Sequence, residues 1–221
     1  MTIYVVRVWV PDRPGALGAV ASRIGAVRGD LVGIDILERG GGRAIDELVV
    51  DLPADDLVPL LVAEMGQVDG VDVEDVRPAP GFVHDPRLDA LETAAVLVEQ
   101  PSVERLLAVL AERARADFEA DWAVVVDLVS ARSVASAGTA PAARWLEAFL
   151  EGAGSSAALS SGNGGPDDLA WAALAPGELS VVLGRVGRPL RARERRQLVA
   201  LARVAESRRG ELASRARMSS L

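Results

Sequence analysis

The chain of 221 residues contains no cysteine and no lysine, and its only histidine is His84. The absence of cysteine excludes disulfides, thiolate nucleophiles and zinc sites built on cysteine. The absence of lysine excludes Schiff bases and the phosphate-binding loops that depend on lysine. A Ser-His-Asp triad would have to use His84, which lies in a stretch rich in proline and glycine.

Carboxylates are the remaining candidates for acid–base chemistry. The pairs Asp55-Asp56 and Asp167-Asp168 show only the placement of solvated residues near helix starts. We therefore expect a protein that is not an enzyme, with no catalytic residues, no metal site and no cofactor.

The net charge of −8 argues against nonspecific binding of nucleic acid by the molecule as a whole. Half of the residues are hydrophobic and a quarter are charged, which is typical of a folded protein. No apolar run approaches the roughly 20 residues that a membrane-spanning helix needs, and the first residues lack the pattern of a signal peptide. We expect a cytoplasmic protein that does not bind membranes.

Strand and helix periodicity alternate in residues 1–79. The first segment has apolar residues at every second position, and the segment after Pro14 has them at helical spacing. Gly40-Gly41-Gly42 predicts a hairpin turn, because glycine tolerates the positive φ of tight turns. The predicted elements are a strand at 2–10, a helix from Pro14 to Val27, strands at 31–39 and 44–52, a helix at 53–66 and a strand at 70–77. This β-α-β-β-α-β order predicts an α+β, ferredoxin-like domain with both helices on one face of a four-stranded sheet.

The junction between the first strand and the first helix reads Asp12-Arg13-Pro14-Gly15-Ala16-Leu17. Together with the element order, this motif resembles the ACT domain, a small regulatory module of amino-acid biosynthetic enzymes and stand-alone regulators. The resemblance covers roughly residues 2–78. It implies a non-catalytic regulatory protein that binds a small ligand, most often an amino acid, at an interface between two copies of the domain. It also implies a homodimer or a higher homo-oligomer.

The start of the first helix has the chemistry to hold a carboxylate. Its first N–H groups have no partner within the helix, the helix dipole is positive there, and a glycine lets a ligand approach closely. In the alternative interpretation the proline and glycine only form a turn, and Asp12 only caps the helix. By the ACT resemblance, the ligand-binding residues are Asp12, Gly15, Ala16 and Leu17 on the loop, with Gly33, Ile34 and Asp35 on the second strand of the partner copy. Asp12 could accept the ligand's ammonium group.

Proline and glycine at Pro78–Gly81 mark a linker at 80–87, which leaves residues 88–217 as a second domain. We expect helices at 86–100, 101–114, 141–150 and after Leu190, strands at 121–128, 169–174 and 178–186, a turn at Pro176-Gly177 and a flexible segment from Gly152 to Pro166. The residues Ser102–Leu107, Gly184-Arg185 and Arg193–Ala202 resemble a degenerate GAF domain, an α/β module whose members enclose a small-molecule pocket and pair through their terminal helices. The resemblance implies a packing and pairing scaffold.

Residues 185–221 hold eleven arginines and three glutamates, a local charge of +8. This arginine-rich end suggests an alternative function, a protein-interaction or transcription-linked module that acts through the last helix. No aromatic residue interleaves with these arginines for base stacking. We favour arginines that are solvated or paired within the protein, and nucleic acid is not an expected partner.

Overall fold

The computed structural model describes residues 2–79, 86–154, 166–175 and 178–219. The chain divides into two compact units, Met1–His84 (unit 1) and Asp85–Leu221 (unit 2). Each unit contains one four-stranded antiparallel sheet. Among the residues that the structure describes, none belongs to a helix that is both long and apolar enough to span a membrane. The predicted linker, 80–87, falls at the division, and its residues 80–85 lie outside the described residues.

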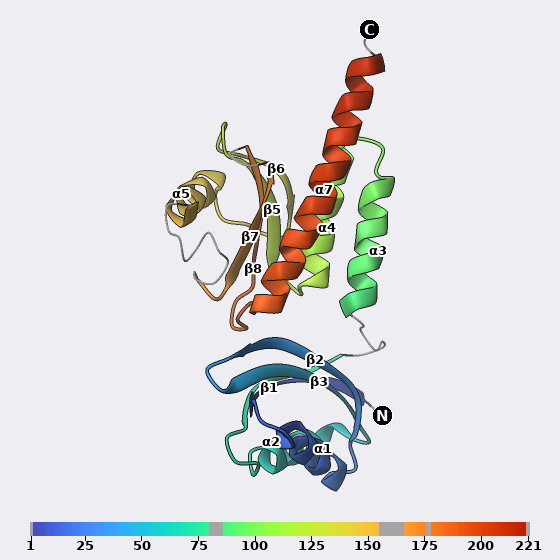
Figure 1. The fold of residues 1–221 in the computed structure, drawn as a ribbon, viewed down its shortest axis with the longest axis vertical. Coiled ribbons are helices and arrows are strands. Elements are labelled where there is room, and N and C mark those ends of the chain that lie inside the picture. The colour runs from blue at the N-terminus through green and yellow to red at the C-terminus, as the bar shows by residue number, and fades with distance from the viewer. Residues whose placement is uncertain (1, 80–85, 155–165, 176–177, 220–221) are drawn as a thin grey trace. The chain divides into compact units, whose positions relative to one another are not determined.

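Unit 1 has the predicted β-α-β-β-α-β order. Its sheet order is β2-β3-β1-β4, so β1 and β3 are central, and α1 and α2 cover one face (Figure 1). This is the ferredoxin-like arrangement. The elements are β1 (Thr2–Pro11), α1 (Ala16–Ala26), β2 (Asp30–Gly40), β3 (Arg43–Leu52), a 3₁₀ turn (Asp55–Leu57), α2 (Val58–Met65) and β4 (Asp72–Pro78).

The core of unit 1 lies between the helices and the sheet. It follows the strand alternation, because every second residue of a strand points to the same face. The buried residues of this face are Tyr4, Val6, Val8 and Val10 of β1 and Leu48, Val50 and Leu52 of β3, which pack against Val20 and Ile24 of α1 and Leu61 and Met65 of α2.

Two local predictions for unit 1 have different outcomes. The β2–β3 hairpin turns at Gly41 and Gly42, whose φ values are +60° and +77°, as the glycine run predicts. The second helix begins at Val58 and not at Pro53, after a 3₁₀ turn. Pro59 explains this start, because a residue without an N–H is best tolerated in the first turn of a helix.

Unit 2 is a sheet of order β6-β5-β8-β7 between two layers of helices. α4 and α7 pack on one face with α3 beside them, and α5 packs on the other face (Figure 1). The elements are α3 (Pro86–Glu99), α4 (Val103–Asp117), β5 (Trp122–Asp127), β6 (Arg132–Ala137), α5 (Ala143–Gly154), β7 (Leu169–Ala175), β8 (Leu179–Gly184) and α7 (Ala192–Ser219).

The central strand β5 is buried on both faces, as its continuous apolar run predicts. Ala123 and Val125 belong to the core under α4 and α7, whereas Val124 and Val126 belong to the core under α5. The structure adds a strand that the sequence analysis missed. β6, with the sequence RSVASA, lies at the sheet edge, and its small, polar and largely exposed residues leave little alternation to detect.

The segment between β6 and β7 differs partly from the prediction. The helix expected at 141–150 is α5, which begins at Ala143 and continues to Gly154. It therefore includes the first residues of the segment expected to be flexible from Gly152 to Pro166. Residues 155–165 of that segment, and the predicted turn at Pro176-Gly177, lie outside the described residues.

Candidate functional site

The start of α1 is open. Gly15 is the N-cap, with φ +85°, and no side chain in the described part of the chain caps the helix. A Cβ added to Gly15 or to Gly18 would meet no heavy atom within 4 Å. The first N–H groups of a helix and its dipole together favour an anion. The tip of α1 thus has the geometry to receive a carboxylate.

Asp12 does not cap α1, so the interpretation of this residue as a simple N-cap is wrong. Its N–H donates to the carbonyl oxygen of Gly42 (2.9 Å), which fastens the loop to the β2–β3 hairpin. Its Oδ1 lies 4.0 Å from Nη1 of Arg39, and both side chains are exposed. Asp12 therefore presents its carboxylate to solvent just before the helix tip.

The predicted site residues Ala16 and Leu17 hold the start of α1 against the core. Ala16 is buried in the core, and Leu17 is half-buried against it, so their side chains anchor the start of α1. The N–H of Ala16 donates to the carbonyl oxygen of Arg13 (3.3 Å), so Leu17 is the first residue of α1 whose N–H is left for a ligand in the described part of the chain.

The predicted strand residues lie in the middle of β2, the edge strand of the sheet. Gly33, Ile34 and Asp35 are in register with Val49, Leu48 and Glu47 of β3. The seven predicted ligand-binding residues therefore form two groups, one on the loop before α1 and one on β2. Their union across two copies of the chain stays a prediction.

The side of β2 that faces the helices is partly uncovered. Ile34 and Ile36 are 45% and 38% exposed. Their partners on β3 are Leu48 and Asp46, and antiparallel partners point to the same face. Apolar side chains thus continue the helix-facing surface beyond the residues that the helices bury.

Asp46 is a residue that the sequence analysis missed. It stands in the buried register of β3, opposite Val8, and only 4% of its surface is exposed. Its Oδ1 is buried without a hydrogen-bond partner in the described residues. Burial raises the pKa of Asp46, nearby Arg39 opposes this rise, and nearby Asp12 adds to it. The sequence signal for Asp46 is a charged residue at a position where the alternation of β3 predicts an inward side chain.

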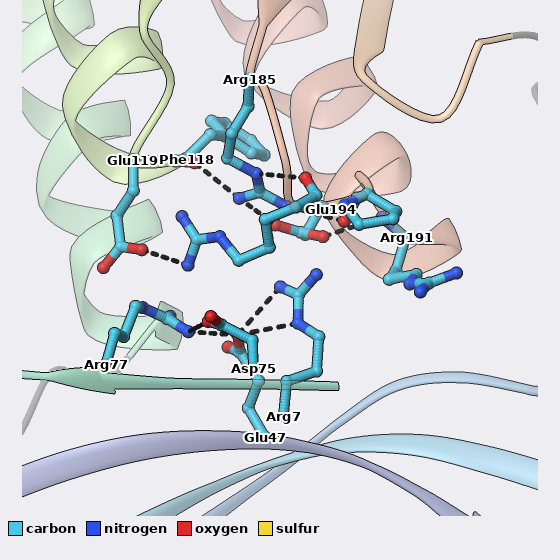
Figure 2. A network of polar contacts seen from close by, with 11 residues as sticks. Arg7, Glu47, Asp75, Arg77, Phe118, Glu119, Arg185, Arg191 and Glu194 are labelled. Atoms are coloured by element: carbon cyan, nitrogen blue, oxygen red, sulfur yellow. Dashed lines mark hydrogen bonds and ion pairs between the residues drawn. The ribbon is translucent and has the colours of Figure 1, made fainter. Parts of the chain in front are cut away.

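The opposite face of the sheet in unit 1 carries a network of charges. Glu47 accepts hydrogen bonds from Nε and Nη2 of Arg7 (3.1 and 2.8 Å) and from Nη1 of Arg77 (3.1 Å), and Arg77 also pairs with Asp75 (3.4 Å; Figure 2). Burial acts to raise the pKa of Glu47, but Arg77 and Arg7 outweigh it and hold that pKa below its ordinary value. The network ties β1, β3 and β4 together.

Arg185, at the end of β8, organises a second network, within unit 2. Its guanidinium donates to the carbonyl oxygens of Phe118 (2.8 Å), Arg188 (2.9 Å) and Pro189 (2.9 Å), and it forms an ion pair with Glu194 (2.8 Å; Figure 2). These contacts link the end of α4, the loop after β8 and the first turn of α7. Arg185 and Glu194, both among the residues that carry the GAF resemblance, thus have a structural role.

Several arginines of α7 are also used within unit 2. Arg195 donates to the carbonyl oxygens of Leu169 (2.6 Å) and Pro166 (3.0 Å), and Arg208 donates twice to that of Gln100 (2.9 and 3.3 Å). The local charge of this end therefore overstates its free basic surface. This agrees with the expectation that its arginines are paired within the protein.

No family model matches the chain, and neither does any curated protein. Among solved structures, the ACT domain of GTP pyrophosphokinase from Chlorobium tepidum is 16% identical, with 36% of this chain and 100% of that one covered and a TM-score of 0.29. The C-terminal domain of the MgtC protein from Mycobacterium tuberculosis is 19% identical, with 38% and 93% covered and a TM-score of 0.30.

Two further similar structures are of chains longer than these two domains. A formyltetrahydrofolate deformylase from Pseudomonas putida is 16% identical, with 40% of this chain and only 36% of the deformylase covered and a TM-score of 0.30. An unknown protein from Galdieria sulphuraria is 15% identical, with 93% and 92% covered and a TM-score of 0.33. At these sequence identities and TM-scores, the similar structures do not assign the chain to a family. The ferredoxin-like fold of unit 1 rests on its own strand order, and the GAF-like interpretation of residues 88–217 stays a prediction.

Proposed function

We propose that the protein is a non-catalytic regulator that binds a small zwitterionic ligand, an amino acid, between two copies of unit 1. One observation carries the proposal: the start of α1 is uncapped and open at Gly15. The ligand's carboxylate would accept hydrogen bonds from the N–H groups of Leu17 and Gly18, since that of Ala16 already donates to the carbonyl oxygen of Arg13. Its ammonium group would lie against the exposed carboxylate of Asp12.

The edge strand β2 supports the part of the proposal that requires a second copy. Its outer edge is unpaired in the sheet, and Ile34 and Ile36 expose apolar surface beside it. Exposed edges of this kind are templates for pairing with another chain. A second copy on this edge would bring its own loop toward Gly33, Ile34 and Asp35, as the ACT resemblance implies.

Thermal unfolding of the full chain in the presence of each of the twenty amino acids tests the proposal. A ligand at about 100 times its dissociation constant stabilises the folded protein by about 2.7 kcal/mol, so at least one amino acid should raise the melting temperature at millimolar concentration. If none does, the proposal fails.

Two variants locate the site. Gly15→Val places a β-branched side chain on the open tip and should abolish the ligand-induced shift. Gly187→Val is the matched control, because Gly187 also has a positive φ (+78°) and open space at its Cβ but lies in unit 2. The control carries the same backbone strain and should respond to the ligand as the unaltered chain does. Asp12→Ala, at an exposed residue, provides a second test that does not depend on strain at Gly15. A full shift in both Gly15→Val and Asp12→Ala would exclude this site.

A further inference from the structure

The buried carboxylate of Asp46 lies on the face of the sheet that carries the open start of α1. Its cross-strand partners are Val8 of β1 and Ile36 of β2. Val8 is part of the core under the helices, and antiparallel partners point to the same face, so the side chain of Asp46 points toward the helices. β3 begins opposite the last residue of β1, at the end of the sheet where the chain turns into α1. Asp12, in that turn, contributes to the raised pKa of Asp46, which places the two carboxylates within electrostatic reach of each other.

The side chain of Asp46 has no partner of its own. It forms no hydrogen bond or ion pair in the described part of the chain, although the residue is only 4% exposed and its Oδ1 is buried. Glu47, the next residue of β3, points to the opposite face and is paired there with two arginines. The guanidinium of Arg39 is exposed and lies 4.0 Å from Asp12. A buried charge without a partner is costly in a folded protein, so Asp46 has unused capacity to bind a group from outside the chain.

Uncovered apolar surface borders Asp46 on one side. Ile36, its partner on β2, is 38% exposed, and Ile34 on the same strand face is 45% exposed. Val8, its partner on β1, is completely buried. The accessible side of Asp46 is therefore the β2 side, and a group that reaches the carboxylate from there passes over apolar side chains. Long basic side chains have the matching composition, an apolar stem with a charged end.

We propose that Asp46 selects a ligand whose side chain ends in a positive charge, an ammonium or guanidinium group that pairs with the Asp46 carboxylate. This inference rests on the proposed function, because it concerns the same ligand at the same helix start. The α-carboxylate of the ligand binds the N–H groups of Leu17 and Gly18, and its α-ammonium group lies against Asp12. The stem of its side chain packs on Ile36. A cation at Asp46 favours the ionised carboxylate that burial disfavours, and hydrogen bonds between charged groups are stronger than those between neutral ones.

Pairs of ligands that differ in charge but little in shape test the inference. Calorimetric titration of the full chain compares L-arginine with L-citrulline, in which an uncharged urea group replaces the guanidinium. It also compares L-lysine with L-norleucine, which lacks the side-chain ammonium group. The basic member of at least one pair should bind at least about tenfold more tightly than its neutral counterpart, because hydrogen bonds to charged groups contribute more than neutral ones.

The outcomes separate this inference from the proposed function. If a neutral amino acid binds and its effect is lost in Gly15→Val, while neither basic amino acid is preferred to its counterpart, the proposed function stands and this inference is wrong. If none of the twenty amino acids binds, the proposed function fails and the inference fails with it.

Asp46→Asn tests the residue itself. Asparagine keeps the shape and an acceptor oxygen but removes the charge, so the preference for the basic ligand should fall at least about tenfold, while the affinity for its neutral counterpart changes little. Asp30→Asn is the matched control, because it removes an exposed carboxylate at the start of β2, the far end of that strand from Arg39. The control should keep the preference of the unaltered chain.

Three results with these variants would overturn the inference. The first is a preference for the basic ligand that survives in Asp46→Asn. The second is an equal loss of affinity for both members of a pair, which is what a purely structural role of Asp46 would produce. The third is the same loss of preference in Asp30→Asn, since the effect would then follow from the net charge of unit 1.

Discussion

Replacing Asp46 by asparagine is expected to stabilise unit 1 at neutral pH. Asp46 is 4% exposed in the apolar register of β3, and its Oδ1 is buried without a partner in the described residues. Burial raises its pKa, and Arg39 offsets only part of that effect. Asparagine keeps the shape and removes the charge that burial disfavours.

The magnitude follows from the environment of this one carboxyl group. A buried polar group without a partner costs about 1–3 kcal/mol, and asparagine recovers the part that is due to charge. Loss of the attraction to Arg39 acts in the opposite direction. We therefore expect a net gain of about 1 kcal/mol, near the lower end of the range. For a domain of the size of unit 1 this raises the melting temperature by roughly 4–8 °C.

The gain should depend on pH in a defined direction. The folded state holds the proton of Asp46 at higher pH than the unfolded chain does, because its pKa lies above the ordinary value of 3.8. The unaltered protein thus loses stability as the pH rises from the ordinary value through the raised one. The advantage of Asp46→Asn should be complete above that interval and should disappear below the ordinary value, where both states of the unaltered protein are protonated.

Scanning calorimetry of the full chain at about pH 7 and about pH 3 measures both effects. Hydrogen exchange of β3 then assigns the change to unit 1. Asp69→Asn is the matched control, because Asp69 is exposed in the same unit and its replacement removes the same charge without relieving burial. A variant less stable than the unaltered protein at neutral pH would refute the reasoning, since Asp46 would then make a favourable contact as a carboxylate. An equal gain at both pH values would refute the assignment to charge.

Three further predictions concern unit 2. Gly184→Ala should destabilise it by about 1–3 kcal/mol in a thermal melt followed by circular dichroism, because the added Cβ would overlap the ring of Trp122. An unchanged melt would mean that the ring moves aside freely. Arg185→Met should cost about 3–5 kcal/mol in urea unfolding, because it removes the donor to buried carbonyl oxygens and one side of the ion pair with Glu194. A cost below about 1 kcal/mol would contradict that role. Arg195→Ala should lower the melting temperature of unit 2 whereas Arg196→Ala should not, since of these two arginines only Arg195 bonds backbone carbonyl oxygens. If the protein instead binds DNA in a salt-dependent way and Arg196→Ala weakens that binding, the result would support the alternative function of the arginine-rich helix.

The fold of unit 1 could be predicted because its signals are local. Alternation in β1 and β3 identifies the buried face, and the hairpin glycines and the proline before α1 mark the turns. The strand β6 gave no such signal. It is an edge strand of small and polar residues, and only its pairing with β5 makes it a strand. The start of α2 was misplaced because Asp55 and Asp56 fit a first helical turn as well as they fit the 3₁₀ turn they form.

Periodicity also leaves open which side of a helix is covered. Leu88, Leu91, Ala95 and Val98 share a face by their spacing alone, yet unit 2 buries the opposite face of α3 around Leu97. An amphipathic pattern predicts that a stripe has a partner, but it does not say whether that partner belongs to the same chain.

In the candidate site, too, features set by neighbouring residues could be predicted from the sequence, whereas contacts between residues distant in the sequence could not. The conformation of Gly15 could be anticipated from the motif around it, because an open helix start with a positive φ requires little more than the glycine itself. Asp46 could have been recognised as a carboxylate at an inward strand position, but its neighbours Asp12 and Arg39 come from other elements, and only the folded sheet brings them within electrostatic reach. A ligand site that needs residues of a second copy is harder still to predict, because no pattern within a single chain gives the position of one chain against another. The ligand experiments therefore address the part of the function that lies beyond the sequence of one chain.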